Sequence, residues 1–310
     1  MEKPNRDAPT AGSDGAELTR RIGLRGQPLL LDGATGTELE RAGLPTGLPL
    51  WSTHALIERP ESVHEIHLRY AQAGAEILTA NTFRTQRRTL ERAGQPPESD
   101  RRLTRLAIEL ARDAAASSTG PMTPWIAGSL PPLEDCYAPE RVPNDDSLER
   151  EHTRQAGLLA EAGADLILAE TMNTIREATA ATRAAIATGL PVLVSFVSWR
   201  AGLLLSGEPL AEAAAIAIDL GASAVGVNCL PPSSLRSCQQ CLSPTGLPLL
   251  VSPNLGEPND QDGFSRDEDA PPEALTMALS DWIAESELRV IGGCCGTTPA
   301  HITALARALP

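Results

Sequence analysis

The chain has 310 residues, of which 42% are hydrophobic and 21% are charged. These fractions are typical of an ordinary folded protein, and they exclude collagen-like, disulfide-scaffold and mostly disordered chains. The 26 basic and 40 acidic residues give a formal net charge of -14, and Lys and Arg form no dense cluster, so we expect no nucleic-acid partner.

The N-terminal segment, residues 1–25, is polar and poor in large apolar side chains, and we expect it to be a disordered extension. It lacks the apolar centre of a signal peptide. No apolar run in the chain approaches the ~20 residues that a membrane helix needs. We therefore expect a cytoplasmic protein with no membrane contact, in which the six cysteines stay reduced.

From residue 26 onward, short apolar runs alternate with amphipathic stretches of helical spacing. The predicted strands are 28–31, 75–80, 125–129, 164–169, 191–196, 224–227, 248–251 and 288–291. Predicted helices between them include 61–73, 101–116, 148–162, 175–187 and 210–220. Eight strand-then-helix units imply parallel pairing and predict one (β/α)8 TIM-type barrel over residues 26–310. A doubly wound open sheet is the main alternative, but the first strand is not followed by the phosphate motif GxGxxG.

Polar residues follow several predicted strands, at the end where the chemistry of such barrels lies. A carboxylate there accepts hydrogen bonds from the ammonium of an amino acid, and Thr or Asn side chains add neutral hydrogen bonds. The predicted substrate-binding residues are Asp32, Asn81, Thr82, Glu170, Thr171 and Asn228. A structural ion pair at the barrel rim is the alternative interpretation of both Asp32 and Glu170.

Three cysteines lie at two of these strand ends. Cys229 follows the sixth strand, and Cys294 and Cys295 follow the eighth, between glycines that allow a tight turn. Three thiolates bind Zn²⁺ and leave its fourth tetrahedral position open, as a catalytic zinc site requires. The alternative is that they are small buried hydrophobic residues, but their placement at one mouth favours a metal site.

Four motifs resemble those of the homocysteine S-methyltransferases, a family that includes the S-methylmethionine and betaine enzymes and the homocysteine-binding module of cobalamin-dependent methionine synthase. They are DGATGT at 32–37, LWS at 50–52, GVNC at 226–229 and GGCCGTTP at 292–299. The resemblance runs from about residue 29 to the end of the chain. It implies a zinc-containing (β/α)8 barrel with Cys229, Cys294 and Cys295 as ligands, and it suggests Glu170 and Asp32 as contacts to the amino acid substrate.

The chemistry of such a site favours methyl transfer to a thiol. A free thiol has a pKa of about 8.5, and coordination to Zn²⁺ deprotonates it. Because three protein thiolates already give the site a net charge of -1, a substrate thiolate bound there stays electron-rich and nucleophilic. An acidic mouth also attracts a cationic methyl donor.

Three functional hypotheses stay open. The first is an enzyme that methylates homocysteine to methionine, with S-methylmethionine or S-adenosylmethionine as donor. The second is a homocysteine-activating barrel that takes its methyl group from a separate corrinoid protein, because this chain is too short for its own cobalamin and folate domains. The third is a non-enzymatic zinc or redox thiol protein. The sequence leaves open the donor, the oligomeric state and whether a selenium analogue replaces homocysteine.

Two long segments, 131–146 and 255–272, are candidate lids over the mouth or simply surface loops. In the first, Tyr137 is positioned in the sequence to stack on a cationic donor, whereas Cys136 is not predicted to be a ligand. Cys238 and Cys241 are predicted to be ordinary thiols on a helix. The histidines expected to be solvated or packed at the surface are His64, His67, His152 and His301.

Overall fold

Eight parallel strands form a barrel in the computed structural model, which describes residues 11–120, 122–200, 202–256 and 270–309. The strands are β1 (Leu29–Leu30), β2 (Ile77–Ala80), β3 (Trp125–Leu130), β4 (Leu166–Met172), β5 (Val192–Phe196), β6 (Ala224–Asn228), β7 (Leu249–Ser252) and β8 (Leu288–Ile291). They pair in the order β1-β8-β7-β6-β5-β4-β3-β2. A parallel bridge between Leu31 and Ile77 joins β1 to β2 and closes the ring. The predicted (β/α)8 barrel and all eight predicted strands are confirmed.

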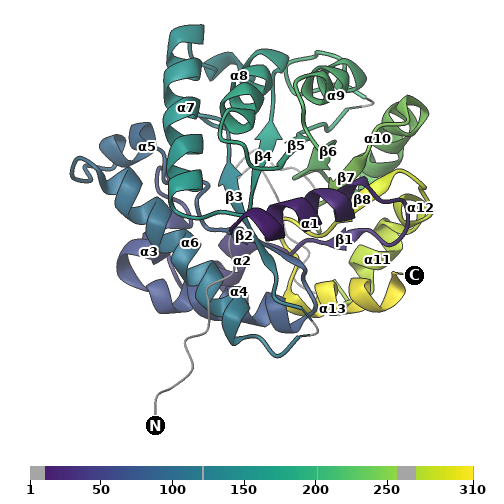
Figure 1. The fold of residues 1–310 in the computed structure, drawn as a ribbon, viewed down its shortest axis with the longest axis horizontal. Helices are drawn as coiled ribbons and strands as arrows, with labels where there is room; N and C mark the ends of the chain where they lie inside the picture. Colours follow the sequence, from purple (N-terminus) through teal and green to yellow (C-terminus); the bar gives the residue numbers. More distant parts are fainter. Residues whose placement is uncertain (1–10, 121, 201, 257–269, 310) are drawn as a thin grey trace.

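Helices surround the barrel (Figure 1). They are α1 (Ala11–Gly23), α2 (Thr35–Arg41), α3 (Thr53–Glu58), α4 (Pro60–Gln72), α5 (Arg87–Arg92), α6 (Ser99–Ser117), α7 (Asp145–Glu161), α8 (Ile175–Ile186), α9 (Leu210–Asp219), α10 (Leu235–Leu242), α11 (Ala274–Ala278), α12 (Ser280–Ile283) and α13 (Pro299–Ala308). The five predicted helices are α4, α6, α7, α8 and α9, each within three residues of its predicted bounds. Side chains cap two of the helices that follow strands: Asn144 accepts from the N–H of Ser147, and Thr174 accepts from that of Glu177.

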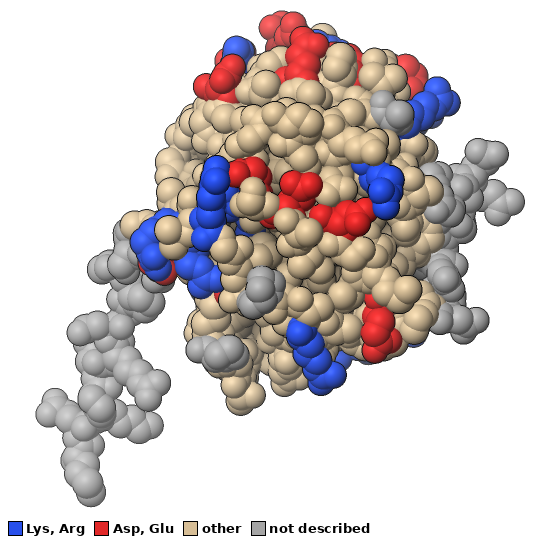
Figure 2. All heavy atoms as spheres, turned by 90° about the vertical axis from the view of Figure 1, so that its right-hand side faces the viewer, with Lys and Arg blue, Asp and Glu red and all other residues tan. Residues whose placement is uncertain are grey.

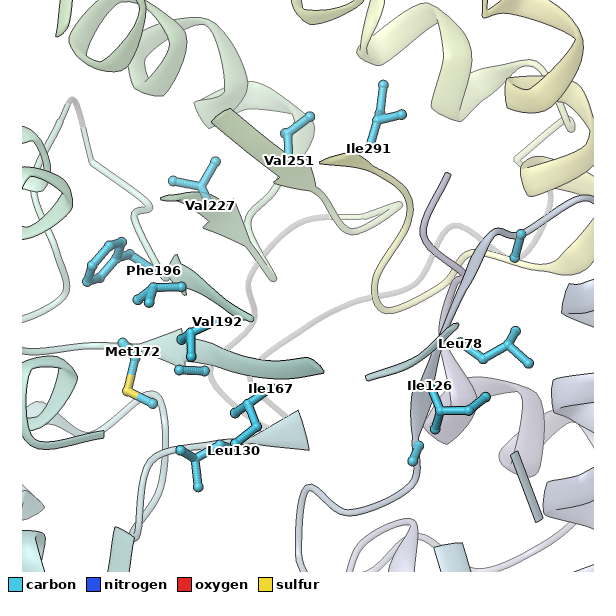
Figure 3. Packing of buried hydrophobic residues seen from close by; sticks show 14 of the residues in the cluster. Leu78, Ile126, Leu130, Ile167, Met172, Val192, Phe196, Val227, Val251 and Ile291 are labelled. Atoms are coloured by element: carbon cyan, nitrogen blue, oxygen red, sulfur yellow. The ribbon is translucent and has the colours of Figure 1, made fainter. Parts of the chain in front are cut away.

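Alternate residues of each strand face opposite sides of the barrel wall. Outward-facing side chains such as Leu78, Ile126 and Val251 pack between the strands and the helices (Figure 3). Inward-facing side chains such as Trp125 and Ala127 fill the barrel interior in a second cluster. The near-continuous apolar runs of the sequence arise because both faces of each parallel strand are buried.

The helix α1 corrects the expectation of a disordered extension over residues 1–25. It lies across the barrel in Figure 1 and buries Leu18 and Ile22 completely against the interior cluster, beside Leu29 at the start of β1. The two apolar residues stand four apart, on one face of the helix. Two apolar residues in a polar segment are too few to predict a buried helix from the sequence. They are buried here because the amino-terminal end of the barrel provides an apolar surface for them. Residues 1–10 lie outside the described residues.

Three histidines are also not the surface groups that we expected. His67 and His152 are completely buried, and His301 is 5% exposed. Burial lowers the pKa of His67 to about 4, so its ring is neutral at pH 7. His152 lies with Nε2 3.2 Å from Oε1 of Glu177, and His301 accepts the N–H of Thr298 in a capping box that starts α13. The residues that bury these three histidines are distant in the sequence, so the sequence alone did not indicate their burial.

On the face shown in Figure 2, acidic side chains lie near the centre with basic side chains on either side, and no continuous basic patch forms there. Among the described residues, no helix combines the length and the apolar character needed to cross a membrane.

Candidate active site

The interior of the barrel changes from apolar to polar toward the carboxyl ends of the strands. On five strands, an apolar inward-facing residue is followed two positions later by a polar one that faces the same way. The pairs are Ile77 and Thr79, Ala127 and Ser129, Leu168 and Glu170, Leu193 and Ser195, and Leu250 and Ser252. These polar residues line a cavity of about 910 Å³ at this end of the barrel. The cavity has the size of a small-molecule site.

Three cysteine sulfurs meet in the wall of this cavity. The Sγ atoms of Cys229, Cys294 and Cys295 all lie within 4.8 Å of one another, and those of Cys229 and Cys295 are 4.0 Å apart. Four sulfurs around a tetrahedral zinc with Zn–S bonds near 2.3 Å would stand about 3.8 Å apart. The cluster therefore has the donor type and the spacing of a thiolate metal site, and all three residues face the cavity.

The backbone N–H groups of the three cysteines donate hydrogen bonds to residues at the end of β7 and directly after it. The N–H of Cys229 donates to Ser252, and the N–H of Cys294 donates to Pro253. The N–H of Cys295 donates to Oδ1 of Asn254, 3.0 Å away. Cys229 itself has φ of 54°, a left-handed conformation that L-residues rarely adopt and that is common at functional sites.

Glycine is required directly after the cysteine pair. Gly296 has φ of 81°, and a Cβ at this position would lie 2.6 Å from the carbonyl oxygen of Leu255. The N–H of Leu255 in turn donates to the carbonyl oxygen of Cys295. The close approach of these two segments fixes the orientation of the pair.

The three thiols influence one another strongly. Hydrogen bonds from Cys294 and Cys295 lower the pKa of the Cys229 thiol well below its usual range. The same contacts to Cys229 raise the pKa of Cys294 and of Cys295. The three thiols therefore titrate as a group rather than independently, and a cation bound between them would favour the thiolate form of all three.

Two aromatic side chains cover the cluster on the side of Cys229. The hydroxyl of Tyr137 lies 2.9 Å from Sγ of Cys229. The ring of Tyr137 packs on that of Trp199, with ring centroids 5.1 Å apart, and the indole N–H of Trp199 donates to the carbonyl oxygen of Cys229. Cys229 is therefore contacted through both its sulfur and its backbone.

Glu170 is held by two polar side chains of the cavity. The hydroxyl of Ser129 donates to its Oε1, and Nδ2 of Asn228 lies 3.3 Å from its Oε2. Burial raises the pKa of Glu170 to about 7. No ion pair of Glu170 occurs within the described part of the chain, so its carboxylate is a ready acceptor for a cationic group of a ligand.

Comparison with known proteins identifies the family. The family model described as Homocysteine S-methyltransferase matches residues 29–309. The chain belongs to the homocysteine S-methyltransferase family. Its sequence is 33% identical to a homocysteine S-methyltransferase of Escherichia coli over 293 residues, 89% of this chain and 94% of the relative. It is 29% identical to a selenocysteine Se-methyltransferase of Brassica oleracea, over 90% of this chain and 88% of the relative.

The fold agrees with this assignment. The metallated crystal structure of the Escherichia coli homocysteine methyltransferase MmuM superimposes with a TM-score of 0.77 at 29% identity. The match covers 91% of this chain and 96% of that chain. The three-cysteine cluster thus lies in a barrel similar to one that was crystallised in a metallated form.

Among the residues predicted to bind substrate in this methyltransferase family member, Asp32 and Asn81 line the cavity but are already engaged. Asp32 accepts from the N–H and the hydroxyl of Thr79, at 2.8 and 2.9 Å, and burial raises its pKa to about 7. Asn81 both accepts from and donates to Ser52. In this structure the two side chains join the first two strands and α3.

Thr171 and Asn228 also line the cavity, and they form one network. Oδ1 of Asn228 accepts from the N–H of Thr171 and from the hydroxyl of Ser195, and Nδ2 donates to the Thr171 hydroxyl. The contact to Glu170 is the fourth hydrogen bond of the Asn228 side chain, which thereby uses its whole hydrogen-bonding capacity. Its amide provides one of the two polar side-chain contacts of Glu170.

Thr82 differs from the prediction. It is completely buried, it is not among the cavity-lining residues, and its hydroxyl donates to the carbonyl oxygen of Ser129. The reason is local: the chain turns after β2, and the hydroxyl of Thr82 faces the neighbouring strand. A position directly after a strand does not by itself decide which way a side chain points.

Sequence reasoning missed several cavity residues. Ser129 and Ser195 lie within predicted strands, where the alternation of inward and outward residues was the available signal. Trp51, Phe83 and Trp199 line the cavity from loops. Trp51 lies in the LWS motif, but nothing in the local sequence placed its ring 5.4 Å from that of Phe83.

The first candidate lid, 131–146, is fixed to the body of the protein by buried hydrogen bonds. The N–H of Leu133 donates to Glu177, and Nδ2 of Asn173 donates to the carbonyl oxygen of Cys136. The loop therefore forms a wall that holds Tyr137 in place. Of the second candidate lid, 257–269 lie outside the described residues. Cys238 and Cys241 lie on α10, as predicted, away from the cavity lining.

Proposed function

We propose that this protein transfers a methyl group from a small sulfonium donor, S-methylmethionine or S-adenosylmethionine, to the thiol of homocysteine, giving methionine. The observation that carries the proposal is that the three-cysteine cluster lines the same cavity as the carboxylate of Glu170, which makes no ion pair within the described residues. A metal site next to an ammonium acceptor fits an amino acid that carries a thiol.

The metal in this proposal is Zn²⁺, held by Cys229, Cys294 and Cys295. Three sulfur donors with one open side fit a catalytic zinc better than a structural one, which would be closed by a fourth protein ligand. When bound, the ion supplies a Lewis acid that keeps an acceptor thiol deprotonated at neutral pH. Because this chemistry needs reduced cysteines, we assign the reaction to a reducing compartment such as the cytoplasm.

The protein's own residues position the acceptor. Glu170, oriented by Ser129 and Asn228, accepts hydrogen bonds from the ammonium group of homocysteine. Tyr137 and Trp199 form a wall that keeps water from Cys229. Because the thiol sulfur is held in one place, its attack on the donor has a smaller entropic cost than the same reaction between free molecules.

The donor enters from the open side of the cavity. The acceptor sulfur forms a bond to the methyl carbon while the bond between that carbon and the donor sulfonium breaks, and the donor leaves as a neutral thioether. The thiol proton goes to solvent before the transfer. A positive donor is attracted by the net charge of -14 and by aromatic faces such as those of Trp51 and Phe83 in the cavity wall.

A donor screen tests the proposal. Zinc-loaded protein is mixed with homocysteine and with each donor in turn, and methionine is measured. Methionine from a small donor supports the proposal. No product with any small donor, but product with a methylated corrinoid protein, would favour the second hypothesis. Selenocysteine is included as an acceptor because one relative is named for that substrate.

A further inference from the structure

Arg84 is a buried cation in the wall of the substrate cavity. It lies four residues beyond β2, it is 8% exposed, and it lines the cavity. It plays no part in the function proposed above. Because moving a charge out of water is costly unless a partner compensates it, a buried guanidinium indicates a nearby anion.

The contacts of Arg84 leave most of its donors unused. Nη1 donates to the carbonyl oxygen of Glu134, 3.0 Å away. Nε is buried without a hydrogen-bond partner, and within the described residues the guanidinium makes no ion pair. Its other contact is with the face of Phe83, where Cζ lies 5.2 Å from the ring centroid. A guanidinium has five N–H donors, so one hydrogen bond satisfies only a small part of it.

Neighbouring arginines are satisfied by carboxylates. Arg87 bonds to Glu98, and Arg88 bonds to Glu134 and Glu151. Four acidic residues share the cavity wall with Arg84, and within the described residues none of them forms an ion pair with it: Asp32, Glu40, Asp135 and Glu170. Oδ1 of Asp135 accepts the N–H of Tyr137. Arg84 thus differs from the arginines beside it in facing the cavity rather than a protein carboxylate.

We propose that Arg84 binds the α-carboxylate of an amino acid substrate in this cavity. A carboxylate accepts two parallel hydrogen bonds from a guanidinium, and such charge-assisted bonds are roughly twice as strong as neutral ones. Glu170 offers the opposite charge on the same cavity, so the two residues match the ammonium and the carboxylate of one class of molecule, the α-amino acids. The inference rests on the proposed function, because both the acceptor and S-methylmethionine belong to that class.

Substrate analogues without the carboxylate test this assignment. The acceptor analogue is aminopropanethiol, and the donor analogue is the aminopropyl dimethylsulfonium ion. Each is compared with its parent substrate in the wild type and in Arg84→Gln, with kcat/KM as the readout. In the wild type, removing the carboxylate that Arg84 binds should lower kcat/KM by roughly 10- to 100-fold. In Arg84→Gln the same removal should cost less than about 3-fold.

The two analogues distinguish the two sources of the carboxylate. Loss of the penalty for the acceptor analogue assigns Arg84 to homocysteine, and loss for the donor analogue assigns it to the donor. An equal penalty in wild type and variant for both analogues would overturn the proposal and leave Arg84 as a support of the Glu134 carbonyl. If Arg84→Gln does not fold, Arg84→Lys carries the same comparison, because it keeps the charge and loses the planar fork.

Arg87→Gln is the matched control. It removes the same charge three residues away, from a side chain that does not line the cavity and pairs with Glu98. It should keep the full carboxylate penalty. Wild-type turnover with complete substrates reports on the proposed function separately. If no small donor gives methionine, calorimetric binding of homocysteine and aminopropanethiol to both proteins still decides whether Arg84 binds a carboxylate.

Discussion

The two ends of the barrel are built from different side chains on the same strands. At the amino-terminal end, Leu29 and Trp125 form an apolar layer that α1 covers with Leu18 and Ile22. At the carboxyl end, the polar residues around Glu170 surround a cavity, and the backbone takes a left-handed conformation at Thr171 and Cys229. Apolar burial stabilises a fold, whereas buried carboxylates and strained backbone cost stability. Substitutions at the two ends should therefore separate stability from activity.

Removing a cysteine ligand should have the largest effect at the carboxyl end. In Cys294→Ala, two sulfurs remain within reach of a cation, and we expect zinc content to fall from one per chain to near zero. Methyl transfer should fall by more than about 1000-fold, since deprotonation of the acceptor thiol is lost. Metal analysis and methionine formation measure these two quantities.

Cys241→Ala is the control for this experiment. Cys241 lies on α10, outside the cluster and the cavity lining, so this variant should keep its zinc and its activity. Full zinc content in Cys294→Ala would show that the cluster is not the metal site. The proposal that the carboxyl end of the barrel carries the activity would then lose its main support.

At the amino-terminal end, Leu18→Ala should lower stability and leave catalysis unchanged. Leu18 is completely buried in the interior cluster, and truncation of a buried leucine costs about 2 to 5 kcal/mol. Denaturant unfolding measures the loss, and kcat and KM at a temperature well below the transition should match the wild type. An unchanged unfolding midpoint would mean that α1 is not docked on the barrel in solution.

Removing the charge of Glu170 should mainly weaken substrate binding. Glu170→Gln keeps the contacts to Ser129 and Asn228 but loses the charge that pairs with an ammonium, and KM for homocysteine should rise by about 10- to 100-fold. Because burial raises the pKa of Glu170 to about 7, the charged, binding form grows as pH rises through 7. The wild type should therefore show a rise of kcat/KM across this range, and this rise should be missing in the variant. Zinc content is the control readout and should not change.

The features that could be predicted from the sequence are those that depend on the order and spacing of the strands. Eight apolar runs gave eight parallel strands, and parallel strands bring residues that follow them, such as Cys229 and Cys294, to one end. Thr82 lies outside the cavity lining because a turn, not the strand, sets the orientation of its side chain. Leu18 was missed because a single i, i+4 pair gains its meaning only from the barrel end that it covers. Arg84 was missed because the absence of an ion pair is a property of packing and leaves no pattern in the chain.

The smallest effect is expected at the contact between Tyr137 and the cluster. Tyr137→Phe removes the hydroxyl 2.9 Å from Sγ of Cys229 and keeps the ring against Trp199. This hydrogen bond is one of those that lower the pKa of Cys229, so without it protons compete better with a metal for that sulfur. Metal affinity, measured by competition with a chelator, should weaken by about 3- to 10-fold, the value of one hydrogen bond.

The only other tyrosine in the chain is the matched control for that variant. Tyr70 is completely buried outside the cavity lining, and its hydroxyl donates to the carbonyl oxygens of Ala34 and Thr297. Tyr70→Phe should lower the melting temperature, because two buried carbonyls lose a donor, and leave the chelator competition unchanged. If both variants changed metal affinity equally, the effect of Tyr137 would be a general loss of packing. A change confined to Tyr137→Phe shows that the wall of the cavity tunes the cluster through one sulfur.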